Sequence, residues 1–280
     1  MLSLEKLIDR SAKLGSLPSI VYRVFDAMVV DYSTATQIGR AINDDPALTG
    51  RLLKLVNSPF YGFSARVDTV YRAVALIGHK ELRSVVVAAS AIKVFDGIPS
   101  ELVDMQAFWK RSLSTAVSAR VLAAFRREKE IERYFIAGLL HDIGSLLLYL
   151  QQPQEMTQVL QLQQTEGISL SQAEKQLLGF DHAEVGGALL KKWNLPPQIC
   201  NAVHFQQTPD KAPMNDRQAA WLLCLARALV DHHLEAQSQL AELPIDNALW
   251  QANELDPVLL EKILQKAEQQ YESSKDILLA

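Results

Sequence analysis

The stretch at residues 138–148, GLLHDIGSLLL, places His141 and Asp142 side by side in one of the most apolar runs of the chain. The apolar residues around the pair predict that it lies at the end of a buried helix. An imidazole nitrogen and a carboxylate are ligands that borderline divalent metals accept, and a carboxylate can bridge two such ions. The stretch therefore decides the expected fold, and it raises the question whether the chain holds the other ligands of a metal site.

The composition is that of a folded globular protein with a substantial core. Of the 280 residues, 49% are hydrophobic and 21% are charged, a balance typical of globular domains. The net charge of −4 argues against broad, sequence-independent binding to nucleic acid, which depends on a basic surface. A nucleic-acid partner is therefore not expected.

The sequence contains no targeting or membrane signal that we can identify. Its first residues, MLSLEKLIDRSAKL, alternate charges with leucines and do not resemble a secretory signal. No run of about 18 uninterrupted apolar residues occurs, so no membrane association is expected. The two cysteines, Cys200 and Cys224, lie among apolar residues and predict buried thiols. We expect a cytoplasmic protein.

Helical periodicity runs through almost the whole chain, whereas the alternation typical of strands is hard to find, so the expected fold class is all-α. The segment DGIPS at 96–100 puts glycine and proline between two long helical patterns, and it divides residues 1–97 from residues 98–280. We expect an N-terminal helical half packed on a helical bundle that ends in a helical extension. In the second part, helices are predicted over 103–126, 131–140, 143–151, 153–166, 170–178, 183–193, 197–206, 215–234 and 257–279, with a weakly patterned segment at 237–255.

Local signals predict several helix ends. Asp45 followed by Pro46 predicts a helix start, because the carboxylate can cap the first turn and proline suits the first helical position. Asp68 is predicted to cap the next helix, which ends at Gly78. The aspartate and glutamate at positions 181 and 184 have the spacing of a capping box.

Three of the six histidines fall, with Asp142, on separate predicted helices of the second part. A helical bundle could bring His141, Asp142, His182 and His204 together, with the adjacent pair at the centre and the other two histidines as outer ligands. Such donors suit Fe, Mn, Mg or Zn, with one coordination position left for a water. These four residues are the candidate metal ligands, and Asp142 is the candidate catalytic residue if the site is active.

Longer stretches of the sequence resemble a known group. GLLHDIGSLLL, with LGFDHAEVGGALLKKWNLPPQICNAVHF at 178–205, resembles the HD superfamily of metal-dependent phosphohydrolases. LPSIVYRVFDAM at 17–28, INDDPALTGRLLKLVNSPFYG at 42–62 and TVYRAVALIGHKELRSVVVA at 69–88 resemble the HDOD family more narrowly. This resemblance covers roughly residues 14–235. It implies an HD-like helical bundle in a bacterial protein of signalling or regulation, in a family most of whose members lack a complete metal site.

The resemblance also implies that ligands of the catalytic HD proteins are missing. Arg111, in FWKRSLSTAVSARVLA, stands where catalytic members carry a metal-binding histidine, and Arg227 aligns with their closing aspartate. His182 and His204 match outer histidines of the related HD-GYP branch, whereas Phe205 stands where that branch has a second paired histidine.

The two arginines have physical consequences for the site. A guanidinium is effectively always protonated and has no lone pair for a metal, so each replacement disfavours metal binding. Asp231, one turn beyond Arg227, is a shifted alternative ligand. A guanidinium could instead pair with Asp142 and take the place of the metal, or it could hold a phosphate-bearing ligand.

We therefore expect a regulatory module with a degenerate HD metal site rather than an enzyme. No catalytic residue, metal or other cofactor is expected, and the expected partners are proteins of a bacterial signalling pathway. Two alternatives stay open: a metal-dependent phosphohydrolase with a reduced metal site, and a sensor that binds a nucleotide or another phosphate ligand in the remnant pocket. That pocket is predicted to consist of Arg111, His141, Asp142, His182, His204 and Arg227.

Overall fold

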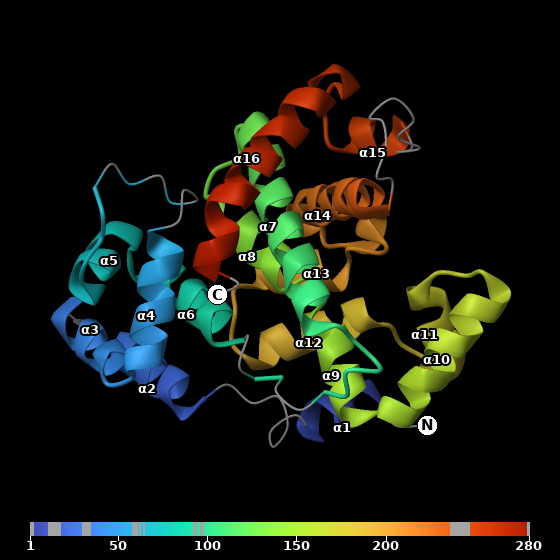
Figure 1. Ribbon diagram of the computed structural model, residues 1–280, viewed down its shortest axis with the longest axis horizontal. Helices are drawn as coiled ribbons and strands as arrows, with labels where there is room; N and C mark the ends of the chain where they lie inside the picture. The colour runs from blue at the N-terminus through green and yellow to red at the C-terminus, as the bar shows by residue number, and fades with distance from the viewer. Residues whose placement is uncertain are drawn as a thin grey trace.

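The structure, a computed structural model, is built from helices, and the residues that it describes contain no strand. It describes residues 3–10, 18–29, 35–57, 61, 63, 65–91, 94–95, 98–235 and 247–278. The predicted all-α fold class is confirmed. In Figure 1 the long helix α7 (Met105–Phe125) runs through the middle of the molecule, with the blue to teal helices α2 to α5 on one side and the yellow-green pair α10 and α11 on the other.

The first part of the chain forms a small helical layer that packs on the second part through several helices. Its helices are α1 (Leu4–Arg10), α2 (Ser19–Val29), α3 (Ala35–Asn43), α4 (Pro46–Val56), α5 (Val70–Ile77) and α6 (His79–Ala91). Helices α2 to α6 contact one another, and α6 also contacts the second part. α1 lies apart from this group and packs on α12, where Lys192 Nζ donates to the carbonyl oxygen of Ile8 at 2.6 Å.

The second part contains the helices that carry the candidate site. They are α7, α8 (Glu132–Leu139), α9 (Ile143–Gln151), α10 (Pro153–Glu166), α11 (Leu170–Leu178), α12 (His182–Lys192), α13 (Pro197–His204), α14 (Met214–Glu235), α15 (Asn247–Ala252) and α16 (Leu260–Leu278), with short 3-10 turns at Pro209–Lys211 and Pro257–Leu259. Three predicted helices, 143–151, 153–166 and 170–178, match at both ends, and the other predicted ends from 103 to 234 lie within two residues of those observed.

The helix caps follow the sequence signals with one correction. Asp45 caps α4 by accepting from the backbone N–H groups of residues 47 and 48, and Gly78 ends α5 with a positive φ of 82°. The predicted cap Asp68 is wrong, because Thr69 lies in extended backbone directly before α5 and its hydroxyl accepts from the Arg72 N–H at 3.3 Å. The predicted capping box at the start of α12 is confirmed, with Asp181 as its first member.

The apolar segment around the His-Asp pair forms the centre of the core. Glu132–Gln151 is long and apolar enough to cross a membrane, but 83% of its most apolar window is buried inside the protein. The chain also turns between Leu139 and Ile143, so the segment is two helices, α8 and α9, rather than one. This segment is a core element on which the candidate site is built.

In the weakly patterned segment at 237–255, the described residues from 247 on contain the short helix α15. Residues 236–246 lie outside the described part of the chain, and so do residues 96 and 97 of the predicted boundary. The buried side chain of Asn253 anchors the end of α15 by donating to the carbonyl oxygens of Trp221 and Leu249. After α15 the chain returns through α16, which packs along α7 and also contacts α4 (Figure 1).

Candidate functional site

Glycines let the helices that carry the candidate residues approach one another at backbone contact. A Cβ at Gly138 would lie 2.5 Å from the Cα of Ala116, so α8 packs directly on α7. A Cβ at Gly144 would overlap the carbonyl oxygen of His182, so α9 packs directly on the start of α12. These two contacts bring the His-Asp pair and His182 into one region of the core.

His141 is buried, with 2% of its surface exposed, and its ring orientation is fixed. Its Nδ1 lies 2.7 Å from the carbonyl oxygen of Gly138. Because a carbonyl only accepts, Nδ1 carries the proton and Nε2 keeps a lone pair. Burial lowers the pKa of His141 to about 3, and the charges of Arg227 and Arg111 act in the same direction. The ring is therefore neutral at physiological pH.

Asp142 is an anion held inside the protein. Its Oδ1 accepts from the Ser145 hydroxyl at 2.5 Å. Burial by itself raises the pKa of this carboxyl group, but the charge of His182, the Ser145 hydrogen bond and the charge of Arg111 together lower its pKa below the usual value. The structure thus supplies cationic neighbours for a half-buried carboxylate.

His182 donates from both ring nitrogens. Its Nδ1 lies 2.6 Å from Glu174 Oε2, which also accepts the His182 backbone N–H at 2.9 Å. The Gln207 amide is oriented so that its oxygen, rather than its NH2 group, faces the Arg227 donors. In this orientation the oxygen accepts from His182 Nε2 at 3.0 Å and from Arg227 Nη1 at 2.9 Å. Burial lowers the pKa of His182, but the charge and the hydrogen bond of Glu174 outweigh it and raise the pKa above its usual value. The acceptors at both ring nitrogens, Glu174 and Gln207, thus favour the doubly protonated ring.

The two arginines of the predicted pocket have other partners than Asp142. Arg111 Nη2 forms an ion pair with Asp231 Oδ1 at 2.6 Å, joining α7 to α14. Arg227 donates to Gln207 as described. Within the described segment 98–235 neither guanidinium forms the direct ion pair with Asp142 that the sequence suggested, although Arg111 lies close enough to lower the pKa of that carboxyl group.

His204 lies beside a different set of charges. A Cβ at Gly187 would overlap the Cβ of His204, so α12 and α13 also meet at backbone contact. The His204 ring packs edge-on against Phe205, with ring centroids 4.4 Å apart. Burial lowers its pKa, while Glu184 and the neighbouring aspartate of the α12 cap oppose that shift. The structure brings five of the predicted pocket residues together and sets His204 on the Glu184 side of α12.

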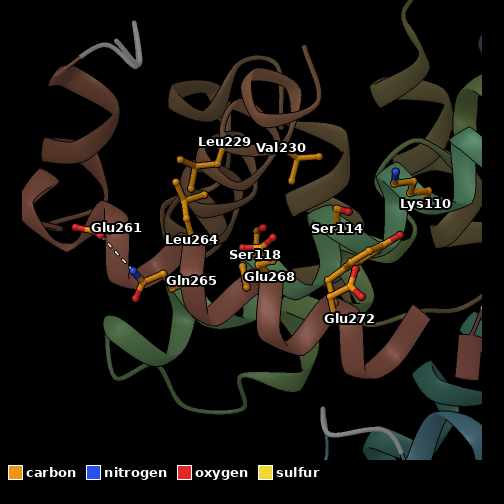
Figure 2. Close-up of a pocket in the computed structure, with 12 residues that line it drawn as sticks. Lys110, Ser114, Ser118, Leu229, Val230, Glu261, Leu264, Gln265, Glu268 and Glu272 are labelled. Atoms are coloured by element: carbon orange, nitrogen blue, oxygen red, sulfur yellow. Dashed lines mark hydrogen bonds between the residues drawn. The ribbon is translucent and has the colours of Figure 1, made fainter. Parts of the chain in front are cut away.

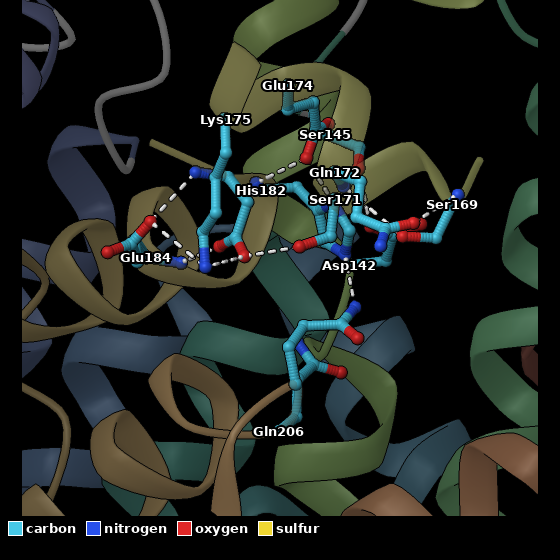
Figure 3. A network of polar contacts seen from close by, with 12 residues as sticks. Asp142, Ser145, Ser169, Ser171, Gln172, Glu174, Lys175, His182, Glu184 and Gln206 are labelled. Atoms are coloured by element: carbon cyan, nitrogen blue, oxygen red, sulfur yellow. Dashed lines mark hydrogen bonds and ion pairs between the residues drawn. The ribbon is translucent and has the colours of Figure 1, made fainter. Parts of the chain in front are cut away.

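Several polar residues of the site were not singled out in the sequence. Glu174, whose side chain is fully buried, holds His182, and Gln206 Nε2 donates to the carbonyl oxygen of His141 at 2.6 Å. Figure 3 shows Glu174 and Gln206 on opposite sides of Asp142. The sequence feature that could have pointed to Glu174 is its place in a helix whose other buried residues are small or apolar.

A second buried network lies next to this one. Asp181 Oδ2 accepts from the Ser171 hydroxyl at 2.6 Å and pairs with Lys175 Nζ at 2.9 Å. Lys175 also approaches Glu184, the other member of the capping box, at 3.9 Å. Because both networks join α11 to the start of α12, they fix the position from which the His182 ring enters the pocket.

The donor set does not fit the dinuclear metal site of an HD enzyme. Among the residues that the structure describes, no group of three His, Cys, Asp or Glu side chains is arranged to hold a metal ion. The guanidiniums of Arg111 and Arg227 have no lone pair to offer a metal. The possible donors among the predicted pocket residues brought together here are His141 Nε2, the Asp142 carboxylate and, after loss of its Nε2 proton, His182.

The sequence matches the family model of the HDOD domain over residues 14–209. An uncharacterised protein of Treponema pallidum (strain Nichols) is 27% identical over 208 residues, which are 74% of this chain and 40% of that protein. The chain thus matches less than half the length of this relative. The family-model match agrees with the resemblance to the HDOD family that the motifs in both parts of the chain indicated.

Two solved structures of similar sequence share the fold. A candidate phosphohydrolase from Shewanella amazonensis SB2B is 26% identical and superposes with a TM-score of 0.75, covering 97% of each chain. The MmoQ response regulator from Methylococcus capsulatus str. Bath is 27% identical with a TM-score of 0.50, covering 88% of this chain and 95% of that one. The fold is therefore found both in a protein named for hydrolysis and in one named for signalling.

Proposed function

Because the chain belongs to the HDOD family, we propose that it is a non-catalytic regulatory module of a bacterial signalling pathway, acting through contacts with protein partners. The observation that carries the proposal is the pair of guanidiniums, Arg111 and Arg227, close to His141 and Asp142. A guanidinium has no lone pair for a metal, and its positive charge disfavours a dication beside it.

The pocket replaces the charge of a metal with charges of the protein. The carboxylate of Asp142 is balanced by the imidazolium of His182 and by the nearby Arg111. A buried anion needs such compensation, because an isolated charge inside a protein is strongly destabilising. In this proposal the network keeps the helical scaffold folded without a metal. The folded scaffold then serves to bind protein partners through its surface rather than to hydrolyse a substrate.

A role in signalling has support from the comparisons. MmoQ is named as a response regulator, and its likeness to this chain extends over most of both proteins. A shared fold does not fix a function, so the site chemistry carries the proposal and this neighbour adds support to it.

The proposal is tested with a panel of phosphate monoesters, phosphodiesters and cyclic nucleotides, with added Mn²⁺, Fe²⁺, Mg²⁺ or Zn²⁺. We expect no turnover above that of the matched Asp142→Ala variant under any of these conditions. Hydrolysis that needs an added metal and disappears in Asp142→Ala would overturn the regulatory assignment.

A metal-dependent phosphohydrolase with a reduced site is the second candidate. It is favoured by the neutral His141, whose Nε2 keeps a lone pair next to the anionic Asp142, and by the candidate phosphohydrolase of similar fold. One metal on this pair could polarise a phosphoryl oxygen. Titration calorimetry with Mn²⁺ decides between the candidates, because this alternative requires one bound ion that is lost in His141→Ala.

The third candidate, a nucleotide or phosphate sensor, has less support. The guanidiniums of Arg111 and Arg227 that would receive a phosphate are already occupied by Asp231 and Gln207. A ligand would have to displace both partners. A thermal-shift screen with nucleotides tests this possibility, because a ligand that binds the folded state raises the melting temperature.

A further inference from the structure

A cavity of about 270 Å³ lies between α7, α14 and α16, outside the candidate site. Each of the three helices supplies lining residues, and Figure 2 shows Leu264 of α16 beside Leu229 of α14 and Glu268 of α16 beside Ser118 of α7. An apolar cavity of about 150 Å³ is large enough to bind benzene. The volume between these helices therefore suits a small organic ligand rather than a single water.

The inner wall of the cavity is apolar. Leu229 and Val230 of α14 and Leu264 and Ala267 of α16 line it, and Leu229, Val230 and Ala267 belong to the buried residues of the protein. Such a wall favours the hydrocarbon part of a ligand, because burying apolar surface stabilises the bound state. The cavity is not a purely apolar void, however, since Ser114 and Ser118 of α7 add hydroxyl groups to its lining.

The charged rim of the cavity is mainly acidic. Three carboxylates, Glu261, Glu268 and Glu272, lie on one face of α16, whereas α7 contributes the single ammonium of Lys110. Glu261 already accepts from the Gln265 side chain at 3.2 Å. Glu268 lies in the middle of this acidic row, between the apolar wall and solvent. Its position suits a cationic head group on a ligand whose body is inside the cavity.

We propose that the cavity between α7, α14 and α16 binds a small amphiphilic amine, with its hydrocarbon body against Leu229 and Leu264 and its ammonium group on Glu268. The apolar wall alone would accept an acid, an alcohol or an amine of the same length. The excess of carboxylates over ammonium groups at the rim selects the amine and repels the acid.

The cavity shares two helices with the candidate site. Lys110 and Val230, which line it, directly precede Arg111 and Asp231, the ion pair that joins α7 to α14. A ligand between these helices would therefore bind next to a contact of the remnant pocket. The binding proposal itself does not depend on the regulatory function, since it rests on the cavity and its charges.

The test uses the whole chain and three probes of equal length, n-hexylamine, hexanol and hexanoate, in calorimetric titrations and thermal melts at neutral pH. Hexylamine at ten times its Kd is expected to raise the melting temperature by roughly 3 °C, with hexanol weaker and hexanoate weakest. Equal binding of hexylamine and hexanoate, or no binding of hexylamine, would overturn the proposal.

Two variants locate the binding. Glu268→Lys, at an exposed position, should weaken hexylamine binding about tenfold or more, whereas the same change at the distant exposed Glu166 should leave it unchanged. Ala267→Leu fills the cavity from its apolar wall and should abolish the hexylamine effect while the variant remains folded by circular dichroism. Hexylamine binding that survives both Glu268→Lys and Ala267→Leu would show that the amine binds elsewhere and would contradict the assignment.

Discussion

At the scale of single residues, the buried carboxylate of Glu174 holds the His182 ring and favours its protonated form. Its raised pKa means that protonation of His182 stabilises the fold below about pH 6.5, the usual value in an unfolded chain, and that this contribution is lost as pH rises through the folded-state pKa. The partner responsible is Glu174. The free energy of unfolding should therefore decrease from pH 6 to pH 9, and the decrease should be smaller when Glu174 carries no charge.

Replacing Glu174 with Gln keeps the shape of the side chain and removes its charge. We expect a loss of about 1–3 kcal/mol in the free energy of unfolding at pH 6, and a smaller loss of stability between pH 6 and pH 9 than in the wild type. Urea unfolding at the two pH values measures both, with Glu166→Gln, at an exposed position, as the matched control. Wild-type pH dependence in Glu174→Gln would show that His182 is not held as an imidazolium.

His141 predicts the opposite pH dependence. Burial lowers its pKa to about 3, so the unfolded chain binds a proton that the folded protein does not, and stability falls as pH drops from about 6.5 toward 3. The full effect is at most about 5 kcal/mol. His141→Asn should reduce the slope of the unfolding free energy in this range by up to about 1.4 kcal/mol per pH unit. An unchanged slope would mean that the ring is protonated in the folded state.

The partners of these residues could not be predicted from the sequence, although the residues themselves could. The apolar run predicted a buried His141 and Asp142, and that burial is observed for His141. Nothing in the sequence pairs Arg111 with Asp231 or Gln207 with His182, because these contacts join different helices. A guanidinium can reach several acceptors, and helix packing decides which one it meets.

At the scale of helices, backbone contacts at glycines set the geometry of the site. Gly144→Ala places a methyl group against the backbone of α12, where neither the His182 carbonyl nor the Gly186 N–H can move aside. We expect a loss of about 3 kcal/mol or more, or failure to fold. Gly50→Ala in α4 is the control, since a Cβ there meets nothing within 4 Å and alanine should stabilise the helix by about 0.5–1 kcal/mol. Thermal melts compare the two, and equal effects would contradict this packing.

Helix positions were more predictable than helix caps and short helices. The second-part helices follow from long apolar stripes, and their ends carry clear signals such as the capping box at Asp181. Asp68 and Thr69 are both good caps in sequence, and only the backbone conformation selects Thr69. The six-residue α15 was missed because so short a helix shows little periodicity, and it depends instead on Asn253 bonding to α14.

At the scale of the whole molecule, the HD-like bundle is expected to be stably folded without a bound metal. The buried charges of the pocket are compensated by other side chains, and α16 closes the bundle along α7. A chelator should therefore leave the melting temperature unchanged, because no metal contributes to the folded state. A melt in the presence and absence of EDTA measures this, and a drop of several degrees with EDTA would point to a structural metal.

The central claim is that protein cations occupy the place of the metal in this pocket. The most direct measurement is elemental analysis of the full chain, purified without chelator from medium supplemented with iron, manganese and zinc. The account predicts well under one equivalent of each metal, unchanged in Asp142→Ala. About one or two equivalents of iron or manganese in the wild type, lost in Asp142→Ala, would contradict it.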